Sequence, residues 1–208
     1  MKDIIIVGAG HLGMDVYYTI KSINKIQPKW RIKGFINDIP VNLEEYKIPE
    51  KIIGTIKDYN PSPDERFVVA IGSPSGRENV VTLLKSKGAI FETIISPLAR
   101  VNETAIVGEG AVILSSSKIA PLVEVGSFAV VGDSTIAFRA SLGDYSNTAS
   151  YANIYQELHV GKRVQIWSHA MILNDVEDDA IVGAGSVVVK KVKAGTKVFG
   201  NPAKRVDL

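Results

Sequence analysis

Aliphatic residues recur at every sixth position over much of the second half of the chain. An amphipathic helix would place apolar residues at i, i+3, i+4 and i+7, and a half-buried strand would alternate strictly. A period of six fits neither pattern. It fits a short extended segment that points one aliphatic side chain inward and then turns a corner. With two shifts of register, the inward positions are Val101, Val107, Ile113, Ile119, Val125, Val131, Leu142, Thr148, Ile154, Val160, Ile166, Ile172, Val176, Val182 and Val188.

Three such segments close a triangular coil of about 18 residues, and stacked coils form a parallel β-helix with continuous apolar ladders inside. Gly follows the aliphatic residue in segments such as VGEGAV, VGSFAV and VGAGSV, which suits a tight corner where a Cβ atom would be costly. The alternative is a β-sandwich whose strands show this spacing by chance. Chance spacing would not hold its register from Val101 to Val188, so the repeat predicts a β-helix.

The hexads and the closing run VGAGSVVVKKVKAGTKVFGNPAKRV resemble the left-handed β-helix acyltransferases of the hexapeptide-repeat family. The most specific part is GAGSVV followed by GNPAK, and the resemblance covers the chain from about Ile95 to the end. It implies acetyl-CoA as co-substrate and a closed homotrimer whose sites lie between subunits. The two shifts of register predict loops or bends, and Phe138 and Arg139, near the first shift, would reshape the cleft.

The first half of the chain has a different pattern, in which buried strands alternate with helices. The aliphatic run Ile4–Val7 is typical of a strand buried on both faces, and a helix is expected over residues 14–23, after the motif GAGHLG. Further strands are expected at residues 30–36, 67–71 and 89–95, a helix at residues 77–87, and a short helix or strand within residues 52–59. This order predicts a small parallel sheet with helices on its faces.

These patterns predict two domains. We expect an α/β, Rossmann-like domain that binds a nucleotide-linked sugar over residues 1–94, and an all-β left-handed parallel β-helix over residues 95–208. A chain of 208 residues is long enough to give each a core. The combination resembles the NeuD/PglD-like subfamily, whose members acetylate the amino group of nucleotide-linked amino-sugars and which includes sialic acid O-acetyltransferases.

The glycine motif is the candidate nucleotide site. Its glycines permit a tight turn and let the backbone approach a phosphate, while the N-terminus of the following helix attracts the anion. An acidic residue at the end of the second strand is the expected partner of the ribose or base. The alternatives are a purely structural strand–helix turn and a dinucleotide-dependent oxidoreductase, which would need a second mononucleotide half. The residues expected at this site are Gly8, Gly10, His11, Gly13, Asn37 and Asp38.

Acetyl transfer from a thioester needs a base for the nucleophile, a donor for the oxyanion and a slot for the acyl carrier. Members of the resembling family supply the base as a His in a segment like I-x-H-D/E-x-x-x-G. The matching segment begins at Ile154, has Gln156 in place of that His, and has Glu157 as the acidic neighbour. A second family His, which reaches the acyl carrier, aligns with Gln165. Gln cannot accept a proton near neutral pH, although it can orient a substrate.

Several arrangements would compensate for the missing base. His159 and His169 are candidates for a displaced imidazole, although each also suits an ordinary surface position. With about 18 residues per coil, Glu157 would lie beneath Asp175, and repulsion between stacked carboxylates raises the pKa of one of them. An amine that is already deprotonated would need little help. Otherwise the chain is a nucleotide-sugar-binding or scaffold protein that has kept the fold and lost the chemistry.

The expected acyl-carrier slot lies near the end of the repeat. Gly183, Ala184 and Gly185 leave backbone groups unshielded, and in the resembling family this groove between neighbouring subunits takes the pantetheine arm. Lysines in the following stretch would meet the phosphates of the carrier, unless they form only a solvated basic end. The remaining residues expected to bind acetyl-CoA are Lys190, Pro202 and Lys204.

Composition removes several classes of protein. Hydrophobic residues make up 46% and charged residues 22%, as in ordinary globular proteins. The net charge of +2 favours neither a nucleic-acid surface nor an acidic tail. The lack of Cys excludes disulfides, thiolate metal sites and a Cys nucleophile, and we expect no bound metal. No apolar run reaches the ~18 residues of a membrane span, so we expect a cytoplasmic protein.

Overall fold

The computed structural model describes residues 1–206, which form two compact units. The first unit ends at Pro97 and the second begins at Leu98. The boundary therefore lies three residues later than the one predicted after residue 94. No helix within residues 1–206 has the length and apolar character that crossing a membrane requires.

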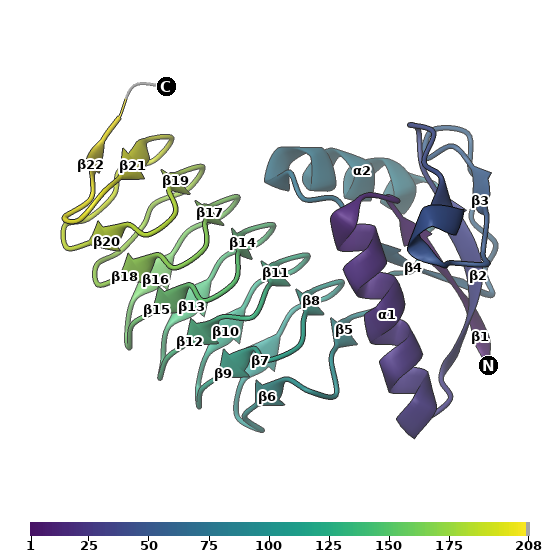
Figure 1. Cartoon of the computed structure of the whole chain (residues 1–208), viewed down its shortest axis with the longest axis horizontal. Helices are drawn as coiled ribbons and strands as arrows, with labels where there is room; N and C mark the ends of the chain where they lie inside the picture. The colour runs from purple at the N-terminus through teal and green to yellow at the C-terminus, as the bar shows by residue number, and fades with distance from the viewer. Residues whose placement is uncertain (207–208) are drawn as a thin grey trace. The chain divides into compact units, whose positions relative to one another are not determined.

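The first unit contains a four-stranded parallel sheet in the order β3-β2-β1-β4 (Figure 1). β1 lies in the interior of the sheet, where Ile5 faces Gly34 of β2 on one side and Phe67 of β4 on the other. Ile5 is fully buried, which confirms the strand predicted from the aliphatic run. The elements are β1 (Lys2–Val7), α1 (His11–Ile26), β2 (Trp30–Ile36), a 3₁₀ helix (Leu43–Tyr46), β3 (Ile52–Gly54), β4 (Glu65–Val69), α2 (Pro74–Ser86) and β5 (Ile94–Ile95).

Both helices of this unit begin earlier than the sequence predicted. α1 begins at His11, within the glycine motif, and α2 begins at Pro74, whose fixed φ suits the first helical position. Ser73 caps α2, because its Oγ accepts the backbone N–H of Gly76 at 3.3 Å. Each helix N-terminus therefore lies close to the end of a strand, β1 for α1 and β4 for α2.

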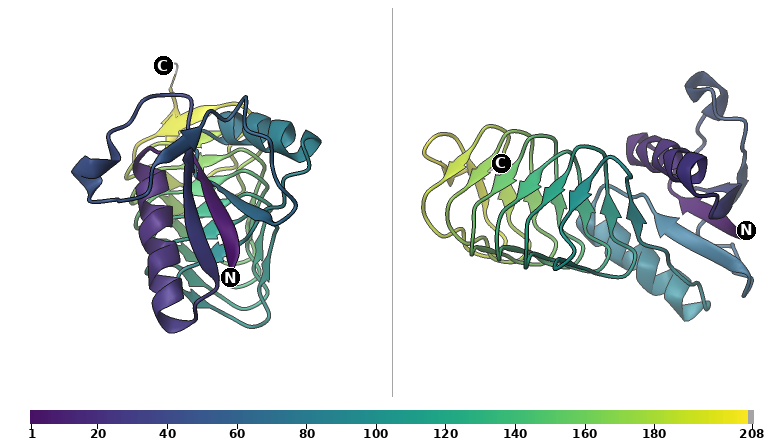
Figure 2. Two further views of the ribbon diagram at one scale, coloured as in Figure 1. Left: turned by 90° about the vertical axis from the view of Figure 1, so that its right-hand side faces the viewer. Right: turned by 90° about the horizontal axis from the view of Figure 1, so that it is seen from below.

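The second unit is a parallel β-helix built from strands of two or three residues. Successive strands belong in turn to three sheets, so each coil has three faces and the coils stack side by side (Figure 2). Face 1 contains β7 (Ile106–Val107), β10 (Glu124–Val125), β13 (Ser141–Leu142) and β16 (His159–Val160). Face 2 contains β8 (Val112–Ile113), β11 (Val130–Val131), β14 (Asn147–Thr148), β17 (Gln165–Ile166), β19 (Ile181–Val182), β21 (Lys197–Phe199) and β22 (Lys204–Arg205). Face 3 contains β6 (Arg100–Val101), β9 (Lys118–Ile119), β12 (Thr135–Ile136), β15 (Asn153–Ile154), β18 (Met171–Ile172) and β20 (Val187–Val188).

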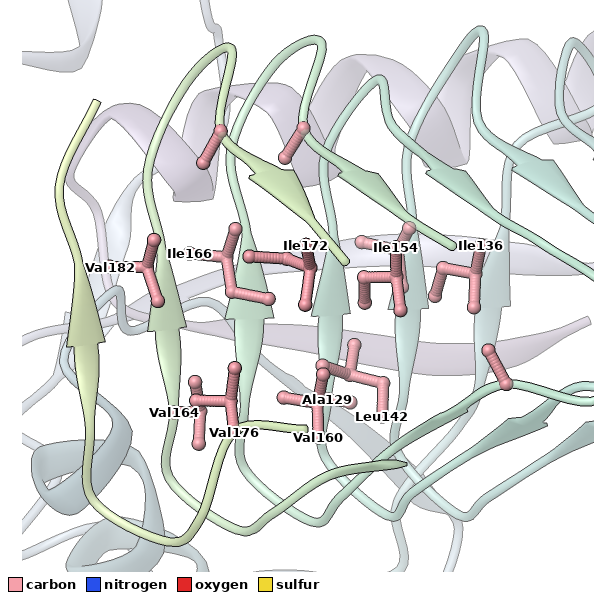
Figure 3. Close-up of a cluster of buried hydrophobic side chains, with 14 of the residues drawn as sticks. Ala129, Ile136, Leu142, Ile154, Val160, Val164, Ile166, Ile172, Val176 and Val182 are labelled. Carbon is pink, nitrogen blue, oxygen red and sulfur yellow. The ribbon is translucent and has the colours of Figure 1, made fainter. Parts of the chain in front are cut away.

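The inward side chains of successive coils form ladders, as the six-residue period predicted. On face 3, Ile136, Ile154 and Ile172 are paired in register and are at most 1% exposed (Figure 3). Thr148 also points into the core, and its Oγ1 lies 2.6 Å from Oγ of Ser134. This hydrogen bond satisfies the one polar side chain among the predicted inward positions.

The shifts of register shorten two corners of the β-helix. The first falls at residues 132–134, and the corner at Phe138, suspected from the sequence, has the regular length. The second shortens the corner after β18, so that Asp175 lies beside His159 instead of Glu157. The backbone N–H of His159 donates to Oδ1 of Asp175, 16 residues later in the chain, at 2.9 Å. The predicted stack of Glu157 on Asp175 is therefore wrong, because the coil is shorter there than the assumed 18 residues.

The glycines that follow inward aliphatics are required by the close stacking of coils. A Cβ on Gly126 would lie 2.5 Å from N of Asp144, and a Cβ on Gly143 would lie 2.5 Å from O of Gly161. The left-handed turn is made two residues after Gly143, at Tyr145, with φ of 58°. A Cβ is costly here, as predicted, but the cause is the approach of the next coil and not the turn.

Replacing Ile154 by Ala is expected to lower the free energy of unfolding by about 2–5 kcal/mol, because its ladder neighbours cannot close the cavity. Ile106→Ala on face 1 is the matched control, since Ile106 is 63% exposed, and its effect is expected to stay within about 0.5 kcal/mol. Chemical denaturation measures both variants. Equal losses would contradict the assignment of the ladder as the core.

Candidate functional site

Two of the three motif glycines are fixed by packing, and the third is open. A Cβ on Gly8, whose φ is 102°, would lie 2.7 Å from O of Ala70, and a Cβ on Gly13 would lie 2.4 Å from O of Gly8. A Cβ on Gly10 would meet no atom within 4 Å. Gly10 is the N-cap of α1, and no side chain caps the helix there. The backbone N–H groups of the first turn of α1 are thus accessible from the side of Gly10.

A second open loop follows β4, the strand beside β1. A Cβ on Gly72, just before the start of α2, would also meet no atom within 4 Å. The chain leaves β1 through α1 to β2 on one side, and leaves β4 through α2 to Phe91, which pairs with Phe67 of β4 on the other side. The chain thus adds strands in opposite directions across the sheet on either side of the β1–β4 pair. Open α/β sheets bind ligands at such a point, beyond the carboxyl ends of the two strands. Two helix N-termini here both favour an anion.

A buried arginine adds positive charge to the second loop. Arg77 of α2 is 1% exposed, and its Nη1 donates to the carbonyl oxygens of Ile71 at 2.5 Å and of Gly72 at 3.4 Å. The guanidinium therefore holds the loop in place and remains charged at any ordinary pH. The sequence did not indicate Arg77, because an Arg in a helix gives no signal that it is buried.

The two polar residues after β2 hold backbone groups. Oδ1 of Asn37 accepts the N–H of Ala9 at 3.1 Å, and its amide group donates to the carbonyl oxygen of Ile39. Oδ1 of Asp38 accepts the N–H of Ile56 at 2.8 Å. Asn37 thus braces the glycine loop from the neighbouring strand, while Asp38 and His11 are both exposed. Contact of Asn37, Asp38 or His11 with a ribose or base stays a prediction.

The predicted catalytic and acyl-carrier residues lie on different parts of the β-helix. Gln156 and Glu157 are exposed on the corner between faces 3 and 1, and Gln165 lies on face 2. His169 lies on the corner between faces 2 and 3, where its ring stacks on Tyr151 with centroids 5.0 Å apart. Their roles in catalysis stay predictions.

The segment that was predicted to hold the acyl carrier is the corner between β19 on face 2 and β20 on face 3, called here the glycine corner. It contains Gly183, Ala184 and Gly185, and the last two are exposed. The N–H of Gly185 donates to the carbonyl oxygen of Ser168 in the preceding coil at 2.9 Å. His169 therefore belongs to the same edge of the β-helix as the glycine corner. Face 1 lies opposite this corner.

His159 lies on face 1 and is held on two sides. Its Nδ1 lies 2.7 Å from Oγ of Ser141 on β13, and its backbone N–H bonds to Asp175. The face is hollowed into a groove of about 380 Å³. The residues that line the groove include Ile106, Glu124, Ser127, Ser141, Asp144, His159 and Lys162.

A basic pocket of about 390 Å³ lies at the end of the β-helix. Lys190 and Lys204, both predicted to meet phosphates, line it together with Lys193 and Arg205, but Pro202 does not. Lys191 also lines the pocket and bonds to Glu177 at 2.8 Å. This hydrogen bond raises the pKa of Lys191, so the cation is already paired with a carboxylate.

Two residues of the β-helix were missed by sequence reasoning. Ser141 lies opposite His159 in the sheet, 18 residues earlier, and the coil period would have found it. Asn147 on β14 lies beside Gln165, and its buried Oδ1 has no hydrogen-bond partner among residues 1–206. An unsatisfied buried acceptor is costly, so this atom suits a ligand or another chain. No group of three or more His, Cys, Asp or Glu side chains in the described part of the chain is arranged to hold a metal ion.

Comparisons with known proteins agree with this architecture. The PglD N-terminal domain family matches residues 3–84. A curated relative, the UDP-N-acetylbacillosamine N-acetyltransferase of Bacillus subtilis (strain 168), is 29% identical over 119 residues, which cover 55% of this chain and 52% of the relative. The chain thus spans about half the length of that relative.

Solved structures match the fold over nearly the whole chain. The acetyltransferase domain of PglB from Neisseria gonorrhoeae FA1090, in complex with acetyl coenzyme A, has a TM-score of 0.88 at 23% identity, covering 99% of each chain. PerB from Caulobacter crescentus, in complex with CoA and GDP-perosamine, has a TM-score of 0.88 at 21% identity, covering 100% of this chain and 98% of that one. Residues 3–84 thus match the PglD N-terminal domain family, and the chain shares the fold of the PglB acetyltransferase domain and PerB, in which a small α/β unit precedes a left-handed β-helix, as the sequence predicted.

Proposed function

We propose that the protein is an acetyl-CoA-dependent acetyltransferase that acts on the amino group of a nucleotide-linked amino-sugar. The observation that carries this proposal is the open space beside Gly10, at the N-terminus of α1. It occurs in a chain that has the fold of PglB and PerB, with a β-helix after the first unit. A nucleotide-linked sugar carries a diphosphate, the anion that paired helix N-termini favour. PglB was solved with acetyl coenzyme A, and PerB with CoA and GDP-perosamine.

The glycine corner and the basic pocket suit the donor. Amide groups of a pantetheine arm would bond to the backbone at Ala184 and Gly185, which is exposed there. The phosphates of CoA would be held by cations such as Lys190 and Lys204 in the terminal pocket. The reaction then transfers the acetyl group from sulfur to nitrogen: the amine attacks the thioester carbonyl, the C–S bond breaks and an amide forms.

The second candidate function is that of a binding or scaffold protein. It is favoured by one observation, that Gln156 and Gln165 replace the two histidines of the resembling family. Such a protein would bind the nucleotide-linked sugar through the glycine loop without turning it over.

A thiol-release assay tests the proposed function. Wild-type protein is incubated with acetyl-CoA and, in turn, UDP-, GDP- and dTDP-linked amino-sugars, and at least one is expected to give stoichiometric thiol and N-acetylated sugar. Titration calorimetry with the same ligands separates the two candidates. Binding of both ligands without thiol release would support the scaffold instead.

We also propose that the protein forms a trimer, and exposed apolar side chains on one edge of the β-helix support it. Phe138, Tyr155, Leu173 and Val189 lie on the corner between faces 3 and 1 in successive coils and are 38–55% exposed. An extended apolar edge of this kind is typical of an interface. A closed ring of three copies would bury it without leaving an open end.

A further inference from the structure

The groove on face 1 contains an imidazole that is positioned by a neighbouring coil. Ser141 and His159 are opposite one another in β13 and β16, and the hydroxyl–Nδ1 distance of 2.7 Å is a hydrogen bond. The backbone of His159 is tied to Asp175 on the next coil. The link from Ser141 comes from a regular rung of face 1 and holds the ring, whereas Asp175 lies in the shortened corner after β18 and holds the backbone N–H of His159.

We propose that His159 accepts the proton from the attacking amine, and that Ser141 is its positioning residue. The inference rests on the acetyltransferase function proposed above. A Ser hydroxyl both donates and accepts hydrogen bonds, so Oγ can accept from Nδ1–H of a neutral imidazole. That tautomer leaves Nε2 as the acceptor, and among residues 1–206 no hydrogen bond engages Nε2.

The other candidate groups fit this role less well. Gln156 cannot accept a proton. The ring of His169 is stacked on Tyr151 at the corner opposite face 1. The groove beside His159 has a volume of about 380 Å³, within the usual range of small-ligand sites.

The charges around the ring suit a proton acceptor. The rungs on either side of the Ser141–His159 pair contribute Glu124 and Asp175, and both are acidic. Farther along the groove, Asp144 is paired with Lys162 at 3.2 Å. The acidic side chains of Glu124 and Asp175 therefore belong to the segments next to the imidazole, while the Asp144–Lys162 pair has no net charge.

The step balances without any further reactant. The amine nitrogen bonds to the carbonyl carbon, the C–S bond breaks, and the electron pair leaves on the thiolate of CoA. Nε2 of His159 takes the proton that the nitrogen loses and passes it to the thiolate, so the products are the N-acetylated sugar and CoA thiol.

Three substitutions test the pair by kinetics. His159→Ala is expected to lower kcat by about 10²–10⁴-fold. Ser141→Ala is expected to lower kcat about tenfold with little change in KM, because it loosens the ring without removing it. Ser141→Thr keeps the hydroxyl and is expected to restore most of the rate. Thr135→Ala, which removes a hydroxyl from face 3, is the matched control and should leave the rate unchanged.

A second measurement does not depend on activity. Nitrogen-15 NMR of His159 is expected to show the Nδ1–H tautomer in wild type and a mixture of tautomers in Ser141→Ala. The opposite tautomer, full turnover by His159→Ala, or an acetyl group found on Ser141 by mass spectrometry would each overturn the proposal. A wild type without any thiol release would instead contradict the acetyltransferase function itself.

Discussion

Gly10→Val is expected to lower the affinity for the nucleotide-linked sugar by about 100-fold, or about 2.7 kcal/mol. The open space beside Gly10 is where a phosphate would approach the N-terminus of α1. A branched side chain there shields the N–H groups and excludes the anion. Because a Cβ at Gly10 meets no atom within 4 Å, the fold itself should tolerate the change.

Gly8→Val makes the comparison sharper. At Gly8 the φ is 102° and a Cβ would lie 2.7 Å from O of Ala70, so any side chain there would destabilise the folded state. Gly8→Val is therefore expected to lose binding together with stability, whereas Gly10→Val loses binding alone. Thr82→Val, at an exposed position of α2, is the control for added apolar surface.

Titration calorimetry with the nucleotide-linked sugar and with acetyl-CoA, together with thermal melts, measures these effects. Gly10→Val should leave acetyl-CoA affinity and the melting temperature close to those of wild type. Unchanged affinity for the nucleotide-linked sugar in Gly10→Val would show that the loop is only a strand–helix turn.

The sequence predicted the fold well where one physical rule acts on many residues at once. The ladder through Ile136, Ile154 and Ile172 follows from the six-residue period, because each inward residue must be apolar whatever its neighbours are. The run at Ile4–Val7 predicted β1 in the same way, and the GAGHLG motif predicted that a helix follows it, although α1 begins three residues earlier than expected.

Single side chains were harder to place, because small shifts of register move them. The pairing of Glu157 with Asp175 failed on one short corner, which put Asp175 next to His159 instead. The periodicity places residues on a face or a corner, but it does not show that Oγ of Ser141 points at a ring nitrogen. Nor does it show that Arg77 is buried, since that depends on the loop carbonyls it bonds.

A single β-helix cannot bring the expected donor and acceptor groups together. Ala184 and Gly185 lie on the corner between faces 2 and 3, and His159 lies on the opposite face of the coil. If the acetyl group is bound at the glycine corner and the amine is deprotonated on face 1, this corner and this face must belong to different copies of the chain. A closed ring of three copies supplies this arrangement at every interface.

Mixing two inactive variants is therefore expected to restore activity. His159→Ala lacks the base, and Ala184→Trp blocks the glycine corner with a bulky side chain at an exposed position. In a trimer that contains both variants, about a third of the interfaces combine an intact base with an intact corner. The two variants are co-expressed with different affinity tags and purified through both tags, and the thiol-release assay then measures the recovered activity. Variants that are expressed separately and mixed at the time of the assay are the control for slow exchange of subunits. Light scattering should give three times the mass of one chain. A single-chain mass, or mixed trimers no more active than either parent, would contradict a site shared between copies.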